Sequence, residues 1–146
     1  MGAILMPPRR SDARQTRCQS WSRTFPATAD QVPQARRFLA GLLDGSPSAD
    51  DALVCLGELA CNALQHSRSG RPGGTFTVRA ALTTATLRVA VEDEGGPWTP
   101  CPGPDDQRGR GLLIVSGLAR AWGRTGGSSI GRTVWFIIDL HQPQPP

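Results

Sequence analysis

The stretch Leu53–His66, LVCLGELACNALQH, predicts the helix around which the rest of the chain is organised. At about 100° per residue, its apolar side chains fall on one narrow stripe, formed by Leu53, Leu56, Ala60 and Leu64. Its polar side chains gather on the opposite side, which holds Glu58, Asn62, Gln65 and His66. A solvated helix face normally mixes Arg or Lys with Glu at four-residue spacing, whereas this face has one carboxylate, two amides and an imidazole. We therefore expect this face to receive another group.

Length and composition are those of a single globular domain. The chain has 146 residues, of which 38% are hydrophobic, and this is long enough for one core. No apolar run approaches the roughly 20 residues that cross a bilayer. The apolar segment Ala3–Met6 is also too short for the core of a signal peptide. We expect a cytoplasmic protein that does not enter a membrane.

The basic residues exclude some chemistry. All 16 are Arg, so a phosphate-binding loop of the GxxxxGK[ST] type and a lysine Schiff base are both impossible. The net charge of +4 is concentrated near the N-terminus, at Arg9, Arg10, Arg14, Arg17 and Arg23. Because the rest of the chain is close to neutral, we expect no direct contact with nucleic acid.

The four cysteines argue against a zinc site. Cys18, Cys55, Cys61 and Cys101 have no CxxC spacing, and the chain has two His. Cys55 and Cys61 lie on the central helix at helical spacing, so we expect reduced thiols at the edge of the core.

The N-terminal half predicts a tail, a strand and two helices. Residues 1–19 have the composition of a disordered basic tail, and a short strand over 20–25 follows. Asp30 is placed to cap a first helix, which Gly45 is placed to end. Ser48 and Asp51 have the spacing of a capping box that opens the central helix.

The C-terminal half predicts two hairpins separated by a lid and a helix. Alternating apolar residues predict strands over 75–82 and 86–92. Residues 94–111 are rich in Gly, Pro and Asp, and a loop of this length is typical of a functional lid. A helix over 112–121 and strands over 122–125 and 133–140 follow, before a loose tail over 142–146. The domain, 20–141, is therefore expected to be an α+β, two-layer sandwich whose mostly antiparallel sheet is covered by helices on one face.

Glu58 and Asn62 form the first of three candidate site motifs. They are four residues apart, so both side chains leave the same helix face. An amide oxygen can serve as one of the few protein ligands of Mg²⁺, which keeps most of its waters and often shares nucleotide phosphates. Glu58 would then be free to act as a base. Taken alone, the pair is also compatible with an ordinary solvated surface.

The other two motifs follow strand 86–92 and precede helix 112–121. Asp93 stands just past an apolar strand, where its carboxylate can accept a hydrogen bond from an exocyclic amine, and Gly95 lets a flat ring approach the backbone. Gly109 and Gly111 stand at the start of a helix, where free N–H groups and the helix dipole favour phosphate. Each motif alone is equally typical of a turn or a glycine-rich loop.

Together these motifs resemble the N box, G1 box and G2 box of the GHKL ATPase superfamily, which has the Bergerat fold. More closely, four segments look like those of bacterial anti-sigma factor serine/threonine kinases: ELACNALQHS (58–67), VEDEGGPW (91–98), GRGLLIV (109–115) and GRTVWF (131–136). The resemblance spans roughly residues 25–140 and keeps the order of the motifs. Four matches in the correct order are far more specific than any one of them.

The resemblance implies a set of site residues. Asn62 matches the Mg²⁺ ligand, and Glu58 matches the general base that would orient or deprotonate a substrate serine. Asp93 corresponds to the adenine-recognising carboxylate, assisted by Gly95 and, through water, by Thr133. The ATP phosphates would meet the lid at four consecutive residues, Gly109, Arg110, Gly111 and Leu112. His66 agrees with the extended N box, although a histidine that serves only the helix end is an equal alternative.

The chain also departs from the family pattern. Pro97 replaces a second glycine that is common in the G1 box of sensor kinases and chaperones, and proline stiffens the entrance of the lid. Because the chain has no Lys, a cation for the transferring phosphoryl group would come from Arg, with Arg108 and Arg110 nearest to the motif.

The family resemblance implies an Mg-ATP-dependent protein kinase. Such a protein sequesters a sigma factor and phosphorylates an anti-sigma factor antagonist on serine. The alternative is an ATP-binding module that sequesters its partner with little or no kinase activity. The catalytic domain of a two-component histidine kinase is disfavoured, since no histidine-bearing dimerisation helices precede the domain. A chaperone or topoisomerase fragment is disfavoured because the transducer domain is missing. We also expect a homodimer formed through the sheet, where Trp135 and Ile137 share the face left open by the helices.

Overall fold

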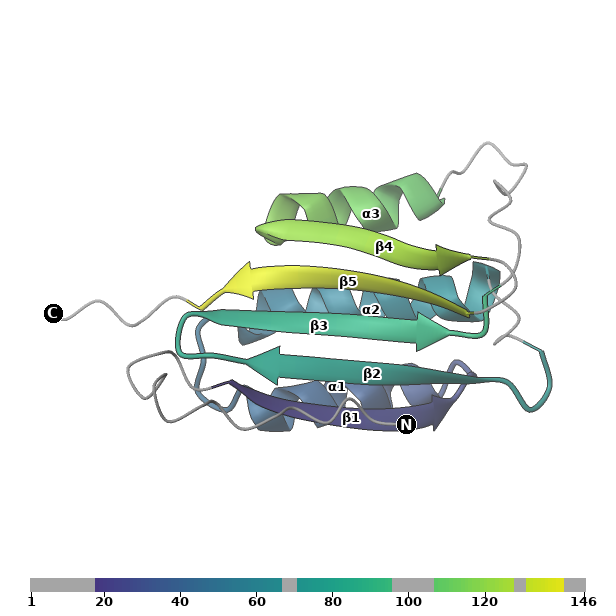
Figure 1. Ribbon diagram of the computed structural model, residues 1–146, viewed down its shortest axis with the longest axis horizontal. Coiled ribbons are helices and arrows are strands. Elements are labelled where there is room, and N and C mark those ends of the chain that lie inside the picture. The colour runs from purple at the N-terminus through teal and green to yellow at the C-terminus, as the bar shows by residue number, and fades with distance from the viewer. Residues whose placement is uncertain (1–17, 67–70, 96–106, 128–130, 141–146) are drawn as a thin grey trace, which may run out of the picture.

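The computed structural model describes residues 18–66, 71–95, 107–127 and 131–140. These ranges form a five-stranded antiparallel sheet with three helices, which confirms the predicted α+β fold (Figure 1). The strands are β1 (Gln19–Pro26), β2 (Thr75–Leu82), β3 (Thr86–Asp93), β4 (Ala121–Gly127) and β5 (Gly131–Asp139). The helices are α1 (Gln31–Leu42), α2 (Ala49–His66) and α3 (Gln107–Leu118). Within these ranges, no helix combines the length and the apolar character needed to cross a membrane.

The strand order is β1-β2-β3-β5-β4, and every neighbouring pair is antiparallel. β3 and β5 are neighbours although α3 and β4 lie between them in the chain, so the second hairpin folds back beside the first. This pairing places Asp93 opposite Arg132, and Glu92 opposite Thr133. The ends of two strands that are distant in sequence therefore meet at one end of the sheet.

One face of the sheet forms the core. Successive side chains of a strand point to opposite faces, and on β2, β3 and β5 every second residue is buried. The largest fully buried side chains of these three strands are Phe76, Phe136 and Leu87. α1 and α2 lie behind this face in Figure 1, and α3 packs against both α2 and β4. Burial of these apolar surfaces is the main favourable term in the stability of the fold.

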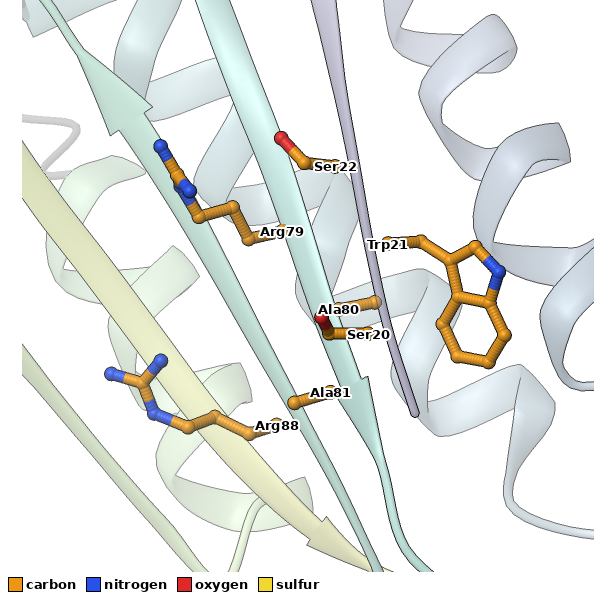
Figure 2. A pocket seen from close by; sticks show the side chains of 7 residues that line it. All are labelled: Ser20, Trp21, Ser22, Arg79, Ala80, Ala81 and Arg88. Atoms are coloured by element: carbon orange, nitrogen blue, oxygen red, sulfur yellow. The ribbon is translucent and has the colours of Figure 1, made fainter. Parts of the chain in front are cut away.

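The opposite face of the sheet carries polar and aromatic side chains. Arg79 pairs with Glu92 at 2.8 Å, and the guanidinium of Arg88 lies 5.2 Å from the centre of the Trp135 ring. A hollow on this face is lined by Ser20, Ser22, Arg79, Ala81 and Arg88, together with Trp21 and Ala80. Figure 2 shows the two arginines extending to one side, while Trp21 turns the other way. The helices thus cover one face only, as the sequence predicted.

Helix α2 is buried more broadly than its sequence pattern indicated. Besides the predicted apolar stripe, Cys55, Leu59, Asn62 and Ala63 are buried. The reason is that α2 packs against β3 and β5 and is flanked by both α1 and α3. The side predicted to be polar is therefore mostly an interface with α3, and of its described side chains only Gln65 is exposed.

The predicted cap of α1 is wrong in its chemistry. Asp30 does occupy the residue before the helix, but its side chain caps no backbone N–H. Asp30 itself has helical backbone angles, φ −68° and ψ −14°, whereas a capping residue normally adopts the β region. Its carboxylate instead accepts hydrogen bonds from the side chains of Thr28 and Gln31, which hold the pKa of Asp30 below its usual value.

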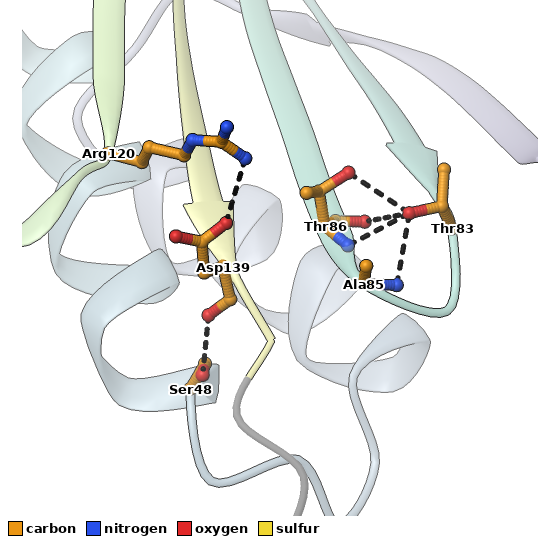
Figure 3. Close-up of polar contacts among 6 residues, drawn as sticks. All are labelled: Ser48, Thr83, Ala85, Thr86, Arg120 and Asp139. Carbon is orange, nitrogen blue, oxygen red and sulfur yellow. Dashed lines mark hydrogen bonds and ion pairs between the residues drawn. The ribbon is translucent and has the colours of Figure 1, made fainter.

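The start of α2 is tied to the end of β5. The Ser48 hydroxyl donates to the carbonyl oxygen of Asp139 at 3.1 Å, and Arg120 Nη1 donates to the Asp139 carboxylate at 3.2 Å (Figure 3). Beside them, the Thr83 hydroxyl accepts the N–H of Thr86 at 2.8 Å in the β2–β3 turn. The contact between Ser48 and Asp139 fixes the start of α2 against the sheet. It therefore helps to determine where the other end of α2 lies.

The third helix begins five residues earlier than predicted and ends three residues earlier. α3 spans Gln107–Leu118, where we expected 112–121. Gly109 and Gly111 therefore lie inside the helix rather than before it. The helix stops because the N–H of Arg120 donates to the carbonyl of Ile137, which draws the chain into β4 from Ala121. The predicted lid is correspondingly shorter, and residues 96–106 lie outside the described ranges.

Candidate functional site

The candidate motifs meet at one end of the molecule. α2 ends at His66, β3 ends at Asp93, α3 begins at Gln107, and β5 begins at Gly131. Figure 1 shows all four of these points at the end of the sheet opposite to that in Figure 3. The segment predicted to be a lid joins β3 to α3 here. A ligand at this end would therefore be within reach of α2, β3 and α3 together.

Glu58 of α2 lies beside Gly111 of α3. Its carboxylate is half-buried, and a Cβ on Gly111 would lie only 2.8 Å from Glu58 Oε2. Real Cβ atoms essentially never come that close, so any other residue at position 111 would displace the carboxylate. The glycine predicted to meet the phosphates thus makes room for the predicted base. Glu58 and Gly111 are brought together as the motif order indicated.

Asn62 lies one turn beyond Glu58 on α2 and is 6% exposed. Its Nδ2 atom is buried and has no hydrogen-bond partner among the described residues. A 180° rotation of the side-chain amide interchanges Oδ1 and Nδ2, so Oδ1 can occupy the position that Nδ2 has here. A buried amide usually satisfies its hydrogen-bonding groups, and one that does not is suited to a ligand. The buried Asn62 amide with an unpartnered Nδ2 atom therefore supports a ligand site here.

The donor set fits magnesium only if a nucleotide supplies most of the oxygens. Among the described residues, no group of three or more His, Cys, Asp or Glu could hold a metal ion. Mg²⁺ is commonly bound by one or two protein oxygens together with water and phosphate. Asn62 Oδ1 is suitable for that role, and the Glu58 carboxylate is one turn away.

Asp93 is held by two neighbours. The N–H of Gly95 donates to Oδ1 at 2.7 Å, and Gly95 has φ +75°, a conformation that side chains rarely adopt. Arg132 donates to Oδ2 twice, from Nε at 3.2 Å and from Nη2 at 3.0 Å. The two side chains are 3% and 5% exposed, so this is a buried ion pair.

Arg132 is a site residue that the motifs did not indicate, although its place in the strand pattern was a signal. In β5, Arg132 shares the parity of Val134, Phe136 and Ile138, which all face the core. A charged residue at the core-facing position of a strand requires a buried partner. That rule pointed to a nearby carboxylate, and Asp93 is directly opposite in the register.

Thr133 and Asp93 both line a hollow at this end of the sheet, but their side chains leave opposite faces. Thr133 is paired with Glu92 and Thr125, and its parity places its side chain on the open face of the sheet. The Asp93 carboxylate lies on the helix-covered face. The water-mediated help predicted from Thr133 stays a prediction.

Several predicted residues can be placed only in part. Leu112 is half-buried in α3. Gly109 and Arg110 belong to the same helix, as does Arg108, but their side-chain positions and that of His66 lie outside the described residues. Pro97 lies in the segment that is not described. Their predicted roles stay predictions.

The surroundings of two thiols on α2 raise their pKa values. Burial raises the pKa of Cys55 to about 11, and Asp51 and Glu58 add to this effect. Burial and then Glu58 raise the pKa of Cys61, while Arg36 partly opposes the rise. Cys55 and Cys61 are free thiols, as we expected, and Cys18 is free as well; Cys101 lies outside the described residues.

The fold is an antiparallel sheet backed by helices on one face, and the candidate motifs lie at one end of it. The chain belongs to the histidine kinase-like ATPase domain family, whose model matches residues 25–138. This confirms the GHKL assignment made from the motifs, and the family implies ATP binding.

A solved structure supports the same fold. "The crystal structure of the RsbU and RsbW domains of Rv1364c from Mycobacterium tuberculosis" matches with a TM-score of 0.67 and 21% identity, over 86% of this chain. This chain spans 33% of the length of that one. No curated protein matches this chain.

Proposed function

We propose that this protein is an Mg-ATP-dependent serine/threonine kinase and anti-sigma factor, which sequesters a sigma factor and phosphorylates its antagonist on serine. The observation that carries the proposal is the meeting of Glu58, Asn62 and Gly111 where α2 packs on α3. Family membership supplies ATP binding. The motif resemblance to anti-sigma factor kinases, and the likeness in fold to an RsbW domain, support the regulatory role.

Glu58 is the residue we assign to the serine. The carboxylate accepts the hydroxyl proton as the serine Oγ attacks the γ-phosphorus of ATP. The bond from that phosphorus to the bridging oxygen breaks, and ADP leaves. Such a transfer depends mainly on positioning and on charge stabilisation. Gly111 leaves the space beside α3 that the Glu58 carboxylate occupies, and a side chain at position 111 would displace that carboxylate.

Asn62 is the residue we assign to the metal. Mg²⁺, when bound, neutralises charge on the ATP phosphates. Asn62 would hold it by the amide oxygen from a buried position on α2, which fixes the ion close to Glu58. In the absence of lysine, Arg108 and Arg110 of α3 remain the proposed cations for the phosphoryl group.

Two variants test the assignment. Asn62→Ala should abolish Mg-dependent ATP binding in calorimetry. Glu58→Gln should retain ATP binding and lose phosphoryl transfer, followed with labelled ATP and a cognate antagonist domain. The test for phosphoserine distinguishes transfer from hydrolysis, because sequestration of a partner cannot produce it. Equal ATP affinity of the wild type and Asn62→Ala would refute the assignment of the metal ligand.

The sequestering alternative makes a different prediction in the same experiment. A module without kinase activity would bind the sigma factor in the presence of ATP and leave the antagonist unmodified. Wild-type protein that binds ATP but yields no phosphoserine would favour that alternative over the kinase. The half-buried carboxylate next to Gly111 favours the kinase, since a pure binding module has no use for a positioned base.

A further inference from the structure

The hydrogen bonds of the Asp93 carboxylate are distributed unequally. Oδ2 accepts two N–H groups of Arg132, whereas Oδ1 accepts one, from the backbone of Gly95. An ionised carboxylate oxygen accepts about two hydrogen bonds. Within the described residues, Oδ2 is thus filled and Oδ1 has one position left.

The two donors fix the direction of that position. Arg132 binds Oδ2 through two nitrogens of one planar group, which resists rotation of the carboxylate better than a single donor does. Gly95 holds the other oxygen from the backbone. The remaining acceptor on Oδ1 therefore has a defined orientation before any ligand arrives. Such preorganisation lowers the cost of binding.

The ion pair of Asp93 and Arg132 differs from a second strand-to-strand pair, which Arg79 and Glu92 form. Arg79 and Glu92 pair on the open face, with side chains 24% and 38% exposed, where solvent weakens the attraction. Asp93 and Arg132 are almost fully buried. A buried ion pair seldom makes a fold more stable than apolar side chains of similar size would. A buried pair can instead serve to orient a functional group.

We propose that Arg132 determines purine specificity by orienting Asp93, so that the open position on Oδ1 accepts the 6-amino group of adenine. This inference rests on the proposed ATP binding at Asp93. Arg132 acts through the carboxylate and is a positioning residue. A 6-oxo purine presents a carbonyl oxygen at the same place, and two acceptors repel each other. Arg132 thereby discriminates adenine from hypoxanthine nucleotides.

The test compares ADP with inosine diphosphate, which differs in the group at position 6. Binding is measured by calorimetry for the wild type, Arg132→Gln and Arg132→Lys. We expect the wild type to prefer ADP by about ten- to a hundredfold, the worth of one hydrogen bond to a charged group. In both variants ADP affinity should fall while inosine diphosphate affinity holds, so that the ratio approaches one.

Arg79→Gln is the matched control, because it removes an arginine from an inter-strand ion pair on the opposite face. Its ratio should equal that of the wild type. Thermal melting checks that each variant is folded, and Arg132→Lys retains the buried positive charge should Arg132→Gln fail to fold. Variants that lose affinity for both nucleotides equally, with the ratio unchanged, would show a merely structural role and overturn the inference. A wild type that binds neither nucleotide would instead refute the proposed function.

Discussion

A Cβ on Gly111 of α3 would stand 2.8 Å from the Glu58 carboxylate of α2. The atom it would meet is the end of a flexible side chain, so a methyl group there moves the carboxylate rather than the helices. The space left by the missing side chain of Gly111 is thus next to the group proposed as base. Gly117, also in α3, has no atom within 4 Å of the corresponding position.

Gly111→Ala is therefore expected to separate catalysis from stability. Alanine favours the helix over glycine by about 0.5–1 kcal/mol, so the free energy of unfolding should not fall. Displacement of the base should slow serine phosphorylation by about tenfold to a hundredfold, while ATP affinity changes little. Gly117→Ala is the control, and it should gain the same stability with full activity. Equal phosphorylation rates for the two variants would mean that Gly111 does not shape the site.

The buried and the half-exposed ion pairs should respond differently when one charge is removed. Asp93→Asn leaves the Arg132 charge buried without its counter-ion, and we expect it to cost about 3–5 kcal/mol of unfolding free energy. Glu92→Gln, the adjacent residue on β3, should cost about 0–1 kcal/mol. Urea denaturation at neutral pH measures both. If Asp93→Asn and Glu92→Gln lost similar unfolding free energies, burial of the Asp93–Arg132 pair would have no effect on the cost of removing one charge.

The spacing of residues along the sequence was enough to predict part of this site, but not all of it. Four-residue spacing placed Glu58 and Asn62 on one side of α2, and the end of an apolar strand located Asp93. The partner of Asp93 is 39 residues away, across the contact between β3 and β5. Which strands become neighbours depends on the whole sheet, so the pair could not be derived from either segment alone.

The early start of α3 has a similar cause. Its first turns contain Gly109 and Gly111, and a local propensity argument places such residues before a helix. Packing against α2 outweighs that propensity, and the small size of Gly111 is what permits the close approach. Asp30 shows the opposite case, because its helical backbone angles removed the capping geometry that its residue type predicts.

Stability above pH 9 should depend on Cys55. The chain has no Lys and no Tyr, so few groups other than thiols titrate between pH 9 and 11. Burial raises the pKa of Cys55 from 9.0 to about 11, which means that the folded protein keeps a proton that the unfolded chain releases. The stabilising contribution is complete below pH 9 and is lost as the pH rises through 11.

Urea denaturation between pH 8 and 10.5 tests this dependence. The unfolding free energy should fall with pH in the wild type and fall less steeply in Cys55→Ala. Cys18→Ala is the control, since that thiol is exposed and should leave the slope as it is. If the unfolding free energy of Cys55→Ala fell with pH as steeply as that of the wild type, groups other than Cys55 would cause the loss of stability at alkaline pH.

The open face of the sheet is where we place the proposed homodimer. Ile137 is half-buried on this face beside Trp135, whose ring packs so closely over Gly123 that a Cβ there would be 2.7 Å from it. A stable interface needs roughly 1,200 Å² or more of buried surface, and an aspartate at its centre would be left without water or a partner. Ile137→Asp should convert a dimer to a monomer in sedimentation at micromolar concentration.

Leu113→Asp is the control, because this 70% exposed leucine lies on α3 away from the sheet face, and that variant should remain dimeric. A wild type that sediments as a monomer, or an Ile137→Asp variant that stays dimeric, would exclude this face as the dimer interface.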